Sequence, residues 1–115
     1  MILGGDLGGT KTLLALAEVV DGHIKIIREQ RFSSTDYGSF DQLLDEFLAD
    51  RPAVASACFG VAGPTDGQTA QLTYLPWSLA AQAISQRFGI AKVRLANDFA
   101  AAANGLSVVD LAFIQ

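Results

Sequence analysis

Residues 4–11 read Gly4-Gly5-Asp6-Leu7-Gly8-Gly9-Thr10-Lys11 and follow the apolar start Met1-Ile2-Leu3. Adjacent glycines such as Gly8 and Gly9 can take positive φ and let a ligand approach the backbone closely. Successive N–H groups in such a turn form an anion-binding nest, to which Thr10 and Lys11 can add a hydroxyl and a cation. Asp6 would repel phosphate directly, so its natural role is to orient Mg²⁺ through water. The stretch predicts a phosphate-binding loop, although the glycines alone fit a plain hairpin turn equally well.

Outward from this loop, the sequence predicts two strands joined by a tight turn. Asp21-Gly22 separates the apolar runs at residues 13–20 and 24–32, and Asp-Gly between such runs is a hairpin signal. The Leu and Ala content of the first run also favours a helix. We assign a strand because Gly8-Gly9 and Asp21-Gly22 bracket a stretch that is short for a helix.

Two helices are expected further along the chain. An apolar stripe at helical spacing predicts the first over residues 40–50, on Phe40, Leu43, Leu44, Phe47 and Leu48. Ser39 and Gln42 form a capping box at its start, and Pro52 ends it. Ser78 is expected to cap the second helix, which runs to Phe88 with Gly89 at its carboxyl end.

Three further strands and a third helix complete the predicted order. Buried strands are expected at residues 54–59, bounded by Gly60, around Val93 and Leu95, and at residues 111–114. Residues 63–76 hold turn signals and predict a loop or short hairpin. Asn97 or Asp98 then opens an Ala-rich helix that ends near Gly105. Three leading strands followed by alternating helices and strands imply an α/β fold with a mixed sheet, in which the helix-linked strands are mostly parallel.

Composition narrows the class of protein. The chain has 115 residues, which fits one domain, and half of them are hydrophobic. The net charge of −4 and the lack of a basic stripe argue against nucleic acid and anionic membranes as partners. No apolar run reaches the ~18 residues of a membrane span. The single cysteine, Cys58, sits in an apolar run and is expected to be buried and reduced, so a cytoplasmic location fits best.

Asn97-Asp98 directly follows a predicted strand and precedes a predicted helix. Asn and Asp are favoured helix N-caps, and that function alone accounts for their position. Open α/β sheets also bind their ligands at the carboxyl ends of strands. There, Asp98 could accept a proton from a substrate hydroxyl while Asn97 hydrogen-bonds the substrate. Trp77 is similarly ambiguous, because a Trp in a loop can line a sugar pocket but is more often part of a core.

Four segments taken together resemble the bacterial glucokinase family, within the ribonuclease H-like, actin-like ATPase fold. The family pattern is G-D-x-G-G-T-N, G-x-A-G-P, N-x-P-W and N-D-F-x-A, in that order. The segments here are Gly5-Asp6-Leu7-Gly8-Gly9-Thr10-Lys11, Gly60-Val61-Ala62-Gly63-Pro64, Tyr74-Leu75-Pro76-Trp77 and Asn97-Asp98-Phe99-Ala100-Ala101. Lys11 and Tyr74 each stand where many members have Asn.

The resemblance implies ATP-dependent phosphorylation of a hexose, with glucose expected. Asp98 would be the base that takes the proton from the sugar 6-hydroxyl, and Asn97 would hydrogen-bond a sugar hydroxyl. The residues facing the ATP phosphates and Mg²⁺ would be Asp6, Gly8, Gly9, Thr10 and Lys11, with Asp6 holding Mg²⁺ through water.

The resemblance also implies that residues 1–115 form the N-terminal small domain of a longer enzyme. Family members are roughly two to three times longer, as expected when two domains enclose a cleft. The C-terminal large domain would then be a missing partner, and we expect the chain alone to be inactive. An exposed final strand would also promote self-association. The alternatives are another sugar kinase of the repressor/ORF/kinase type, an actin-like nucleotide-binding module, and a sugar sensor without turnover.

Overall fold

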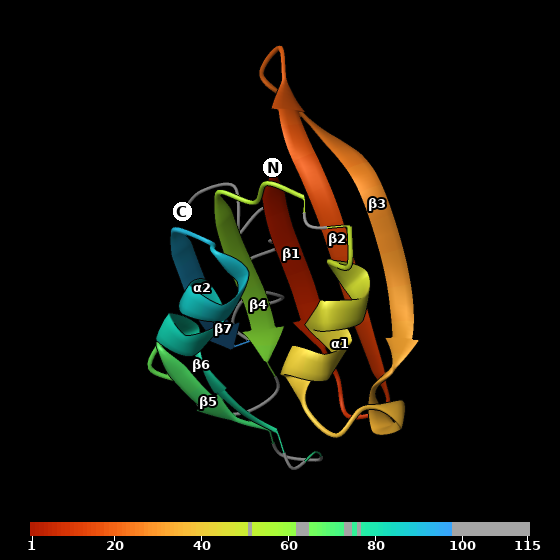
Figure 1. Cartoon of the computed structure of the whole chain (residues 1–115), viewed down its shortest axis with the longest axis vertical. Helices are drawn as coiled ribbons and strands as arrows, with labels where there is room; N and C mark the ends of the chain where they lie inside the picture. The colour runs from red at the N-terminus through yellow and green to blue at the C-terminus, as the bar shows by residue number, and fades with distance from the viewer. Residues whose placement is uncertain (51, 62–64, 73–74, 76, 98–115) are drawn as a thin grey trace.

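A five-stranded mixed sheet organises the chain, with strand order β3-β2-β1-β4-β7 (Figure 1). The computed structural model describes residues 1–50, 52–61, 65–72, 75 and 77–97. The antiparallel meander consists of β1 (Ile2–Leu7), β2 (Lys11–Val20) and β3 (His23–Ser33). Strands β4 (Ser56–Val61) and β7 (Lys92–Asn97) run parallel to β1. The prediction of three leading strands and parallel, helix-linked strands is therefore confirmed.

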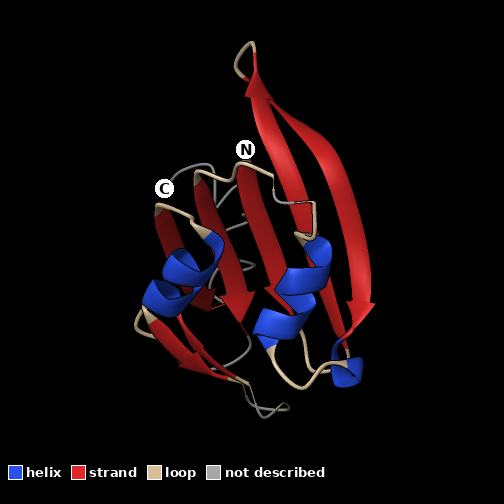
Figure 2. Cartoon of the chain, in the orientation of Figure 1, coloured by secondary structure: helices blue, strands red, loops and turns tan. Residues whose placement is uncertain are grey.

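Helices α1 (Phe40–Phe47) and α2 (Ala81–Phe88) cover one face of this sheet (Figure 2). A single 3₁₀ turn, η1 (Ser34–Asp36), follows β3. Strands β5 (Thr69–Gln71) and β6 (Ser78–Ala80) form a separate two-stranded sheet. Within the described residues, no helix has the length and apolarity needed to cross a membrane.

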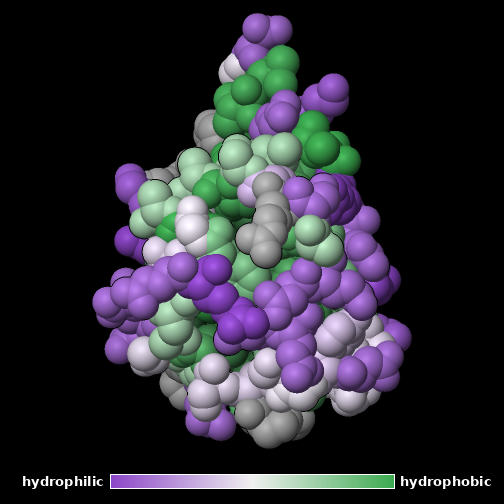
Figure 3. All heavy atoms as spheres, in the orientation of Figure 1, coloured by the Kyte–Doolittle hydropathy of each residue, from purple (hydrophilic) through white to green (hydrophobic). Residues whose placement is uncertain are grey.

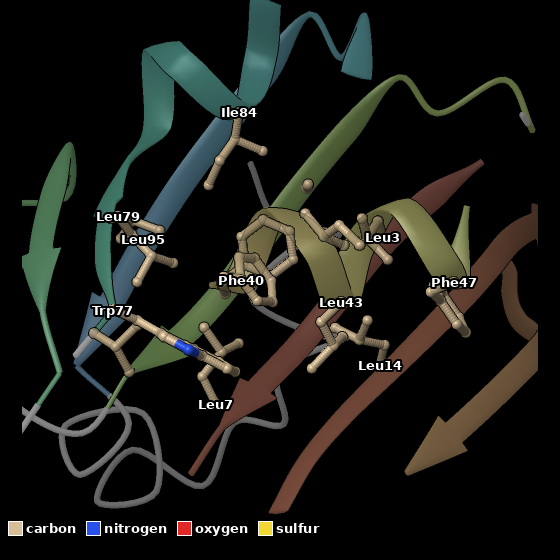
Figure 4. Close-up of a cluster of buried hydrophobic side chains, with 14 of the residues drawn as sticks. Leu3, Leu7, Leu14, Phe40, Leu43, Phe47, Trp77, Leu79, Ile84 and Leu95 are labelled. Atoms are coloured by element: carbon tan, nitrogen blue, oxygen red, sulfur yellow. The ribbon is translucent and has the colours of Figure 1, made fainter. Parts of the chain in front are cut away.

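The main core lies between the helices and the sheet. Figure 4 shows its side chains pointing toward one another from β1, β2, α1, β6, α2 and β7. Every second residue of a strand faces the same side, which explains why Leu3 and Leu7 lie in this core while Asp6 lies on the other face of β1. The largest buried side chain among the described residues is Trp77, and its ring centroid lies 5.8 Å from that of Phe40.

The β2–β3 hairpin projects beyond the rest of the sheet (Figure 1). Asp21 and Gly22 form its turn, with φ of 51° and 80°, as the Asp-Gly signal predicts for a turn that needs two left-handed residues. Figure 3 shows a polar tip above an apolar surface on this ribbon. The exposed apolar side chains there are Val19, Val20, Ile26 and Ile27.

Several predicted boundaries differ from the structure. The first helix ends at Phe47 rather than at residue 50, because Leu48 leaves the helical conformation. The strand predicted at residues 54–59 lies at Ser56–Val61 and continues through Gly60, where parallel pairing with both neighbours extends it. The Ser39 cap is confirmed, since its hydroxyl accepts a hydrogen bond from the Gln42 N–H at 3.3 Å. The αL conformation of Gly89 confirms the predicted end of the second helix.

Ser78 does not cap the second helix. It lies in β6, whose residues pair with β5, and the residue before the helix is Ala80, which makes no side-chain cap. Strand pairing with β5 has overridden the local capping preference of serine. The predicted Ala-rich helix and the strand at residues 111–114 lie outside the described residues.

Cys58 is fully buried on the sheet face opposite α1 and α2, as predicted for a structural thiol. Burial raises the pKa of the Cys58 thiol from its ordinary 9.0 to about 11, although nearby Arg94 opposes this shift. The thiol therefore stays neutral in the folded protein at pH values where the unfolded chain ionises.

We expect Cys58 to make the folded state less stable as pH rises from about 9 towards about 11. The unfolded thiol ionises first in this window, and the linked loss is at most ~1.4 kcal/mol per pH unit. Urea unfolding at several pH values would show a steeper decline for the native chain than for Cys58→Ala. Parallel declines would show that another group causes the alkaline sensitivity.

Candidate phosphate and sugar site

Three parallel strands end at the same edge of the sheet. Leu7 at the end of β1 pairs with Val61 at the end of β4, and Val61 pairs with Asn97 at the end of β7. Neighbouring strands lie about 4.8 Å apart, so the backbones of Leu7 and Asn97 are separated by about 10 Å. The glycine loop follows β1, and the Asn-Asp pair begins at the end of β7. The glycine loop and Asn97, some ninety residues apart in sequence, thus lie at one edge of the sheet.

The glycine loop is shorter than the sequence indicates. Gly4 to Leu7 belong to β1, and only residues 8–10 connect it to β2. The Gly8 N–H donates a hydrogen bond to the Lys11 carbonyl at 3.0 Å. Residues 8–11 therefore form a very tight connection, with the side chains of Thr10 and Lys11 exposed to solvent.

The reason for glycine at position 8 is space rather than positive φ. The described glycines with positive φ are Gly22, Gly67 and Gly89, so neither Gly8 nor Gly9 uses the positive φ that glycine allows. A Cβ at Gly8 would lie 2.7 Å from the Lys11 carbonyl oxygen, closer than such atoms approach. Because the obstructing atom is backbone, alanine here would force the loop open.

Gly5 has a different function, which the sequence did not reveal. A Cβ at this position would lie 2.7 Å from side-chain atoms of both Leu14 and Phe59. Gly5 therefore gives these two core residues room to pack across the sheet. Within the segment that resembles a phosphate motif, one glycine serves the core and another serves the turn.

A pair of buried hydroxyl groups supports the loop from the interior. The side chains of Thr12 on β2 and Ser34 on η1 are fully buried, and their oxygens lie 2.8 Å apart. The Ser34 hydroxyl donates to the Gly8 carbonyl at 2.8 Å, and the Ser34 N–H donates to the Thr10 carbonyl at 2.9 Å. The sequence did not point to either residue. Ser34 directly follows β3, and no local pattern indicates that a serine there contacts the loop between β1 and β2.

Asp6 is half-buried on the face of β1 opposite the helices. Within the described ranges, no three His, Cys, Asp or Glu side chains gather in a group able to hold a metal ion. Mg²⁺ accepts one or two protein carboxylates when water and phosphate oxygens complete its coordination. A carboxylate at Asp6 is compatible with an ion that binds together with a nucleotide and takes its other ligands from water and phosphate oxygens.

The remaining predicted positions have different outcomes. Asn97 is the last residue of β7, while Asp98 lies outside the described residues. Trp77 belongs to the core, and its indole N–H donates to the Tyr37 carbonyl at 3.2 Å. The core interpretation of Trp77 is thereby confirmed over the pocket-lining one.

The segment that leads into the β5–β6 hairpin is hydrogen-bonded to β7. The Leu95 N–H on β7 donates to the Gly67 carbonyl at 3.0 Å. A surface hollow of about 660 Å³ runs along this hairpin. Its walls include Thr65 and Asp66, and the Asp66 carboxylate accepts hydrogen bonds from the N–H groups of Gln68 and Thr69. These bonds lower the pKa of Asp66, since they stabilise its ionised form.

Comparison with known proteins gives a consistent result. A family model described as "Glucokinase" matches residues 3–112. A glucokinase of Nostoc punctiforme (strain ATCC 29133 / PCC 73102) is 39% identical over 110 residues, covering 93% of this chain and 32% of the relative. A glucokinase of Yersinia pestis (strain Pestoides F) is 31% identical over 108 residues, covering 93% of this chain and 33% of the relative.

Solved structures agree with these sequence relatives. A glucokinase from an Antarctic psychrotroph superimposes with a TM-score of 0.75 at 32% identity, covering 87% of this chain and 33% of that structure. Leishmania braziliensis glucokinase gives a TM-score of 0.64 at 26% identity, covering 90% of this chain and 31% of that structure. The chain thus spans about a third of the length of the relatives it matches.

Proposed function

The chain belongs to the glucokinase family, and from that premise we propose that it contributes to the transfer of the γ-phosphoryl group of ATP to a hexose. Glucose is the hexose we propose, with glucose 6-phosphate as the product that enters glycolysis. A cytoplasmic setting is part of the proposal, and the buried, free thiol of Cys58 is consistent with it.

The shared strand edge is the observation that supports this proposal most directly. Leu7, Val61 and Asn97 are aligned in register, so a phosphate-binding loop after β1 and a sugar-binding pair after β7 would flank one site. Phosphoryl transfer requires little covalent chemistry from the protein and depends mainly on holding two substrates in line. Two segments about 10 Å apart across the β4 strand suit that requirement.

We assign the following parts. Backbone N–H groups of the loop, with the Thr10 hydroxyl and the Lys11 ammonium, bind the ATP phosphates. Asp6 orients Mg²⁺, which would neutralise charge on the phosphate oxygens when it is bound with ATP. Asn97 hydrogen-bonds a sugar hydroxyl, and Asp98 accepts the proton of the attacking 6-hydroxyl.

The whole reaction also needs groups from outside this chain. Because the chain spans about a third of its relatives, we propose that a further domain supplies the adenosine pocket and more of the sugar site. The 115-residue chain alone should therefore give no useful turnover. A rate near the ~1–100 s⁻¹ of ordinary kinases from the chain alone would contradict this.

A chimaeric enzyme tests the proposal. Residues 3–112 would replace the matching segment of the Nostoc punctiforme relative, and ADP formation would be followed with and without glucose. We expect turnover that depends on glucose. A folded chimaera that hydrolyses ATP without regard to sugar would favour the actin-like nucleotide module, and a clear preference for another hexose would favour a different sugar kinase.

A further inference from the structure

We propose that Ser34 is a positioning residue for the phosphate-binding loop, an inference that rests on the proposed function of that loop. Ser34 lies on η1, outside the glycine loop and outside every segment of the family pattern. It contacts the loop twice, through its hydroxyl to the Gly8 carbonyl and through its N–H to the Thr10 carbonyl. One residue therefore holds two of the peptide groups in the connection between β1 and β2.

The direction of the hydroxyl bonds follows from proton counting. A serine hydroxyl has one proton to donate, and Ser34 uses it on the Gly8 carbonyl. In the 2.8 Å contact between the two hydroxyls, Thr12 must then be the donor and Ser34 the acceptor. The result is a directed chain from Thr12 to Ser34 to Gly8, in which Thr12 orients the hydroxyl that holds the loop.

This series of hydrogen bonds determines where the N–H groups of the loop point. In a planar trans peptide, the C=O and the following N–H point in opposite directions. Because the Gly8 carbonyl faces Ser34, the Gly9 N–H points away from Ser34. The Thr10 carbonyl also faces Ser34, so the Lys11 N–H is turned away as well. The Gly9 N–H is thereby aimed away from the buried hydroxyl pair, as an anion-binding turn requires, whereas the Lys11 N–H lies on the side of β2 that faces Gly8, because the Lys11 carbonyl accepts a hydrogen bond from the Gly8 N–H.

Burial makes this orientation strict. Thr12 and Ser34 are fully buried, where a polar group that loses its partner cannot turn to water. If the Gly8–Gly9 peptide rotated to face the other way, Ser34 would lose its acceptor. The loop is therefore held in its binding orientation before any ligand arrives, which lowers the ordering cost of binding phosphate.

The decisive variants are Ser34→Ala and Thr12→Val, with Thr12→Ser as the conservative partner. Ser34→Ala removes the bond to Gly8, whereas Thr12→Val removes only the group that orients Ser34. Thr12→Ser keeps the hydroxyl and should behave like the native chain. The matched control is Ser85→Ala, which deletes a hydroxyl bond to the Ile90 carbonyl at the end of α2, away from the loop.

In the 115-residue chain, NMR would report amide exchange and ¹⁵N relaxation at Gly9 and Lys11. We expect both amides to become more mobile in Ser34→Ala, less so in Thr12→Val, and to be unchanged in Thr12→Ser and Ser85→Ala. In the chimaera, Ser34→Ala should raise the KM for ATP by about tenfold while the KM for glucose changes little, since misplaced contacts of this kind reduce binding steeply.

The outcomes separate this inference from the proposed function. Equal loop mobility in Ser34→Ala and Ser85→Ala would overturn the inference, whatever the chimaera does, and so would a mobile loop with an unchanged KM for ATP. If Ser34→Ala does not fold, Thr12→Val decides by the same two measurements. A chimaera without glucose-dependent turnover would instead overturn the proposed function, and the loop measurements in the chain would still decide whether Ser34 orders it.

Discussion

Replacing Trp77 with alanine is expected to lower the free energy of unfolding by about 3–5 kcal/mol, the usual range for removing a buried aromatic side chain. Trp77 is 1% exposed and is the largest fully buried side chain of the described core. Its ring contacts Phe40, which in turn lies 4.9 Å from Phe59 on β4. The substitution would leave a large cavity where the segment before β6 meets α1. Since the free energy of unfolding of a domain is only ~5–15 kcal/mol, Trp77→Ala would remove much of the stability of the chain.

The measurement is urea unfolding followed by far-UV circular dichroism, because the variant lacks the chain's only tryptophan. Trp77→Phe is the matched variant, since it keeps an aromatic ring and loses the bond to the Tyr37 carbonyl. It should lie between the native chain and Trp77→Ala. Ile27→Ala on the exposed β3 strand should change stability by less than about 1 kcal/mol. A loss below ~1 kcal/mol for Trp77→Ala would mean that the indole does not pack as described.

The features that the sequence predicts well are those set by neighbouring residues. The Asp21-Gly22 turn, the Ser39 cap and the Gly89 end each follow from the backbone preferences of one or two residues. The apolar stripe of α1 likewise follows from spacing within a single helix. The mixed sheet was predictable because connections through helices favour parallel strands.

The features that the sequence does not predict depend on residues that the fold brings together. Ser78 has the character of a helix cap, yet pairing with Gln71 places it in a strand. The need for glycine at position 5 comes from Phe59, fifty-four residues later. The contact of Ser34 with Gly8 depends on the register between β2 and β3, and strand register cannot be assigned from one strand alone.

The candidate site divides in the same way. The glycine loop and Asn97 are recognisable as segments, and the alignment of Leu7, Val61 and Asn97 gives them a common edge. The function of Asp98 does not follow from that alignment, because an aspartate at this position also suits a helix N-cap. A substitution that preserves capping and removes proton acceptance can separate the two.

Asp98→Asn in the chimaeric enzyme is expected to lower kcat by about 10²–10⁴-fold, the usual contribution of a positioned general base. Asparagine caps a helix about as well as aspartate, so the melting temperature should stay close to that of the parent. Asp98→Ala, which removes both capabilities, should lose activity to a similar extent and also lose ~0.5–2 kcal/mol of stability. Steady-state kinetics and thermal unfolding on the same samples measure both effects. If Asp98→Asn keeps near-normal kcat while Asp98→Ala is destabilised, Asp98 is a helix cap, and the proton acceptor must be sought elsewhere.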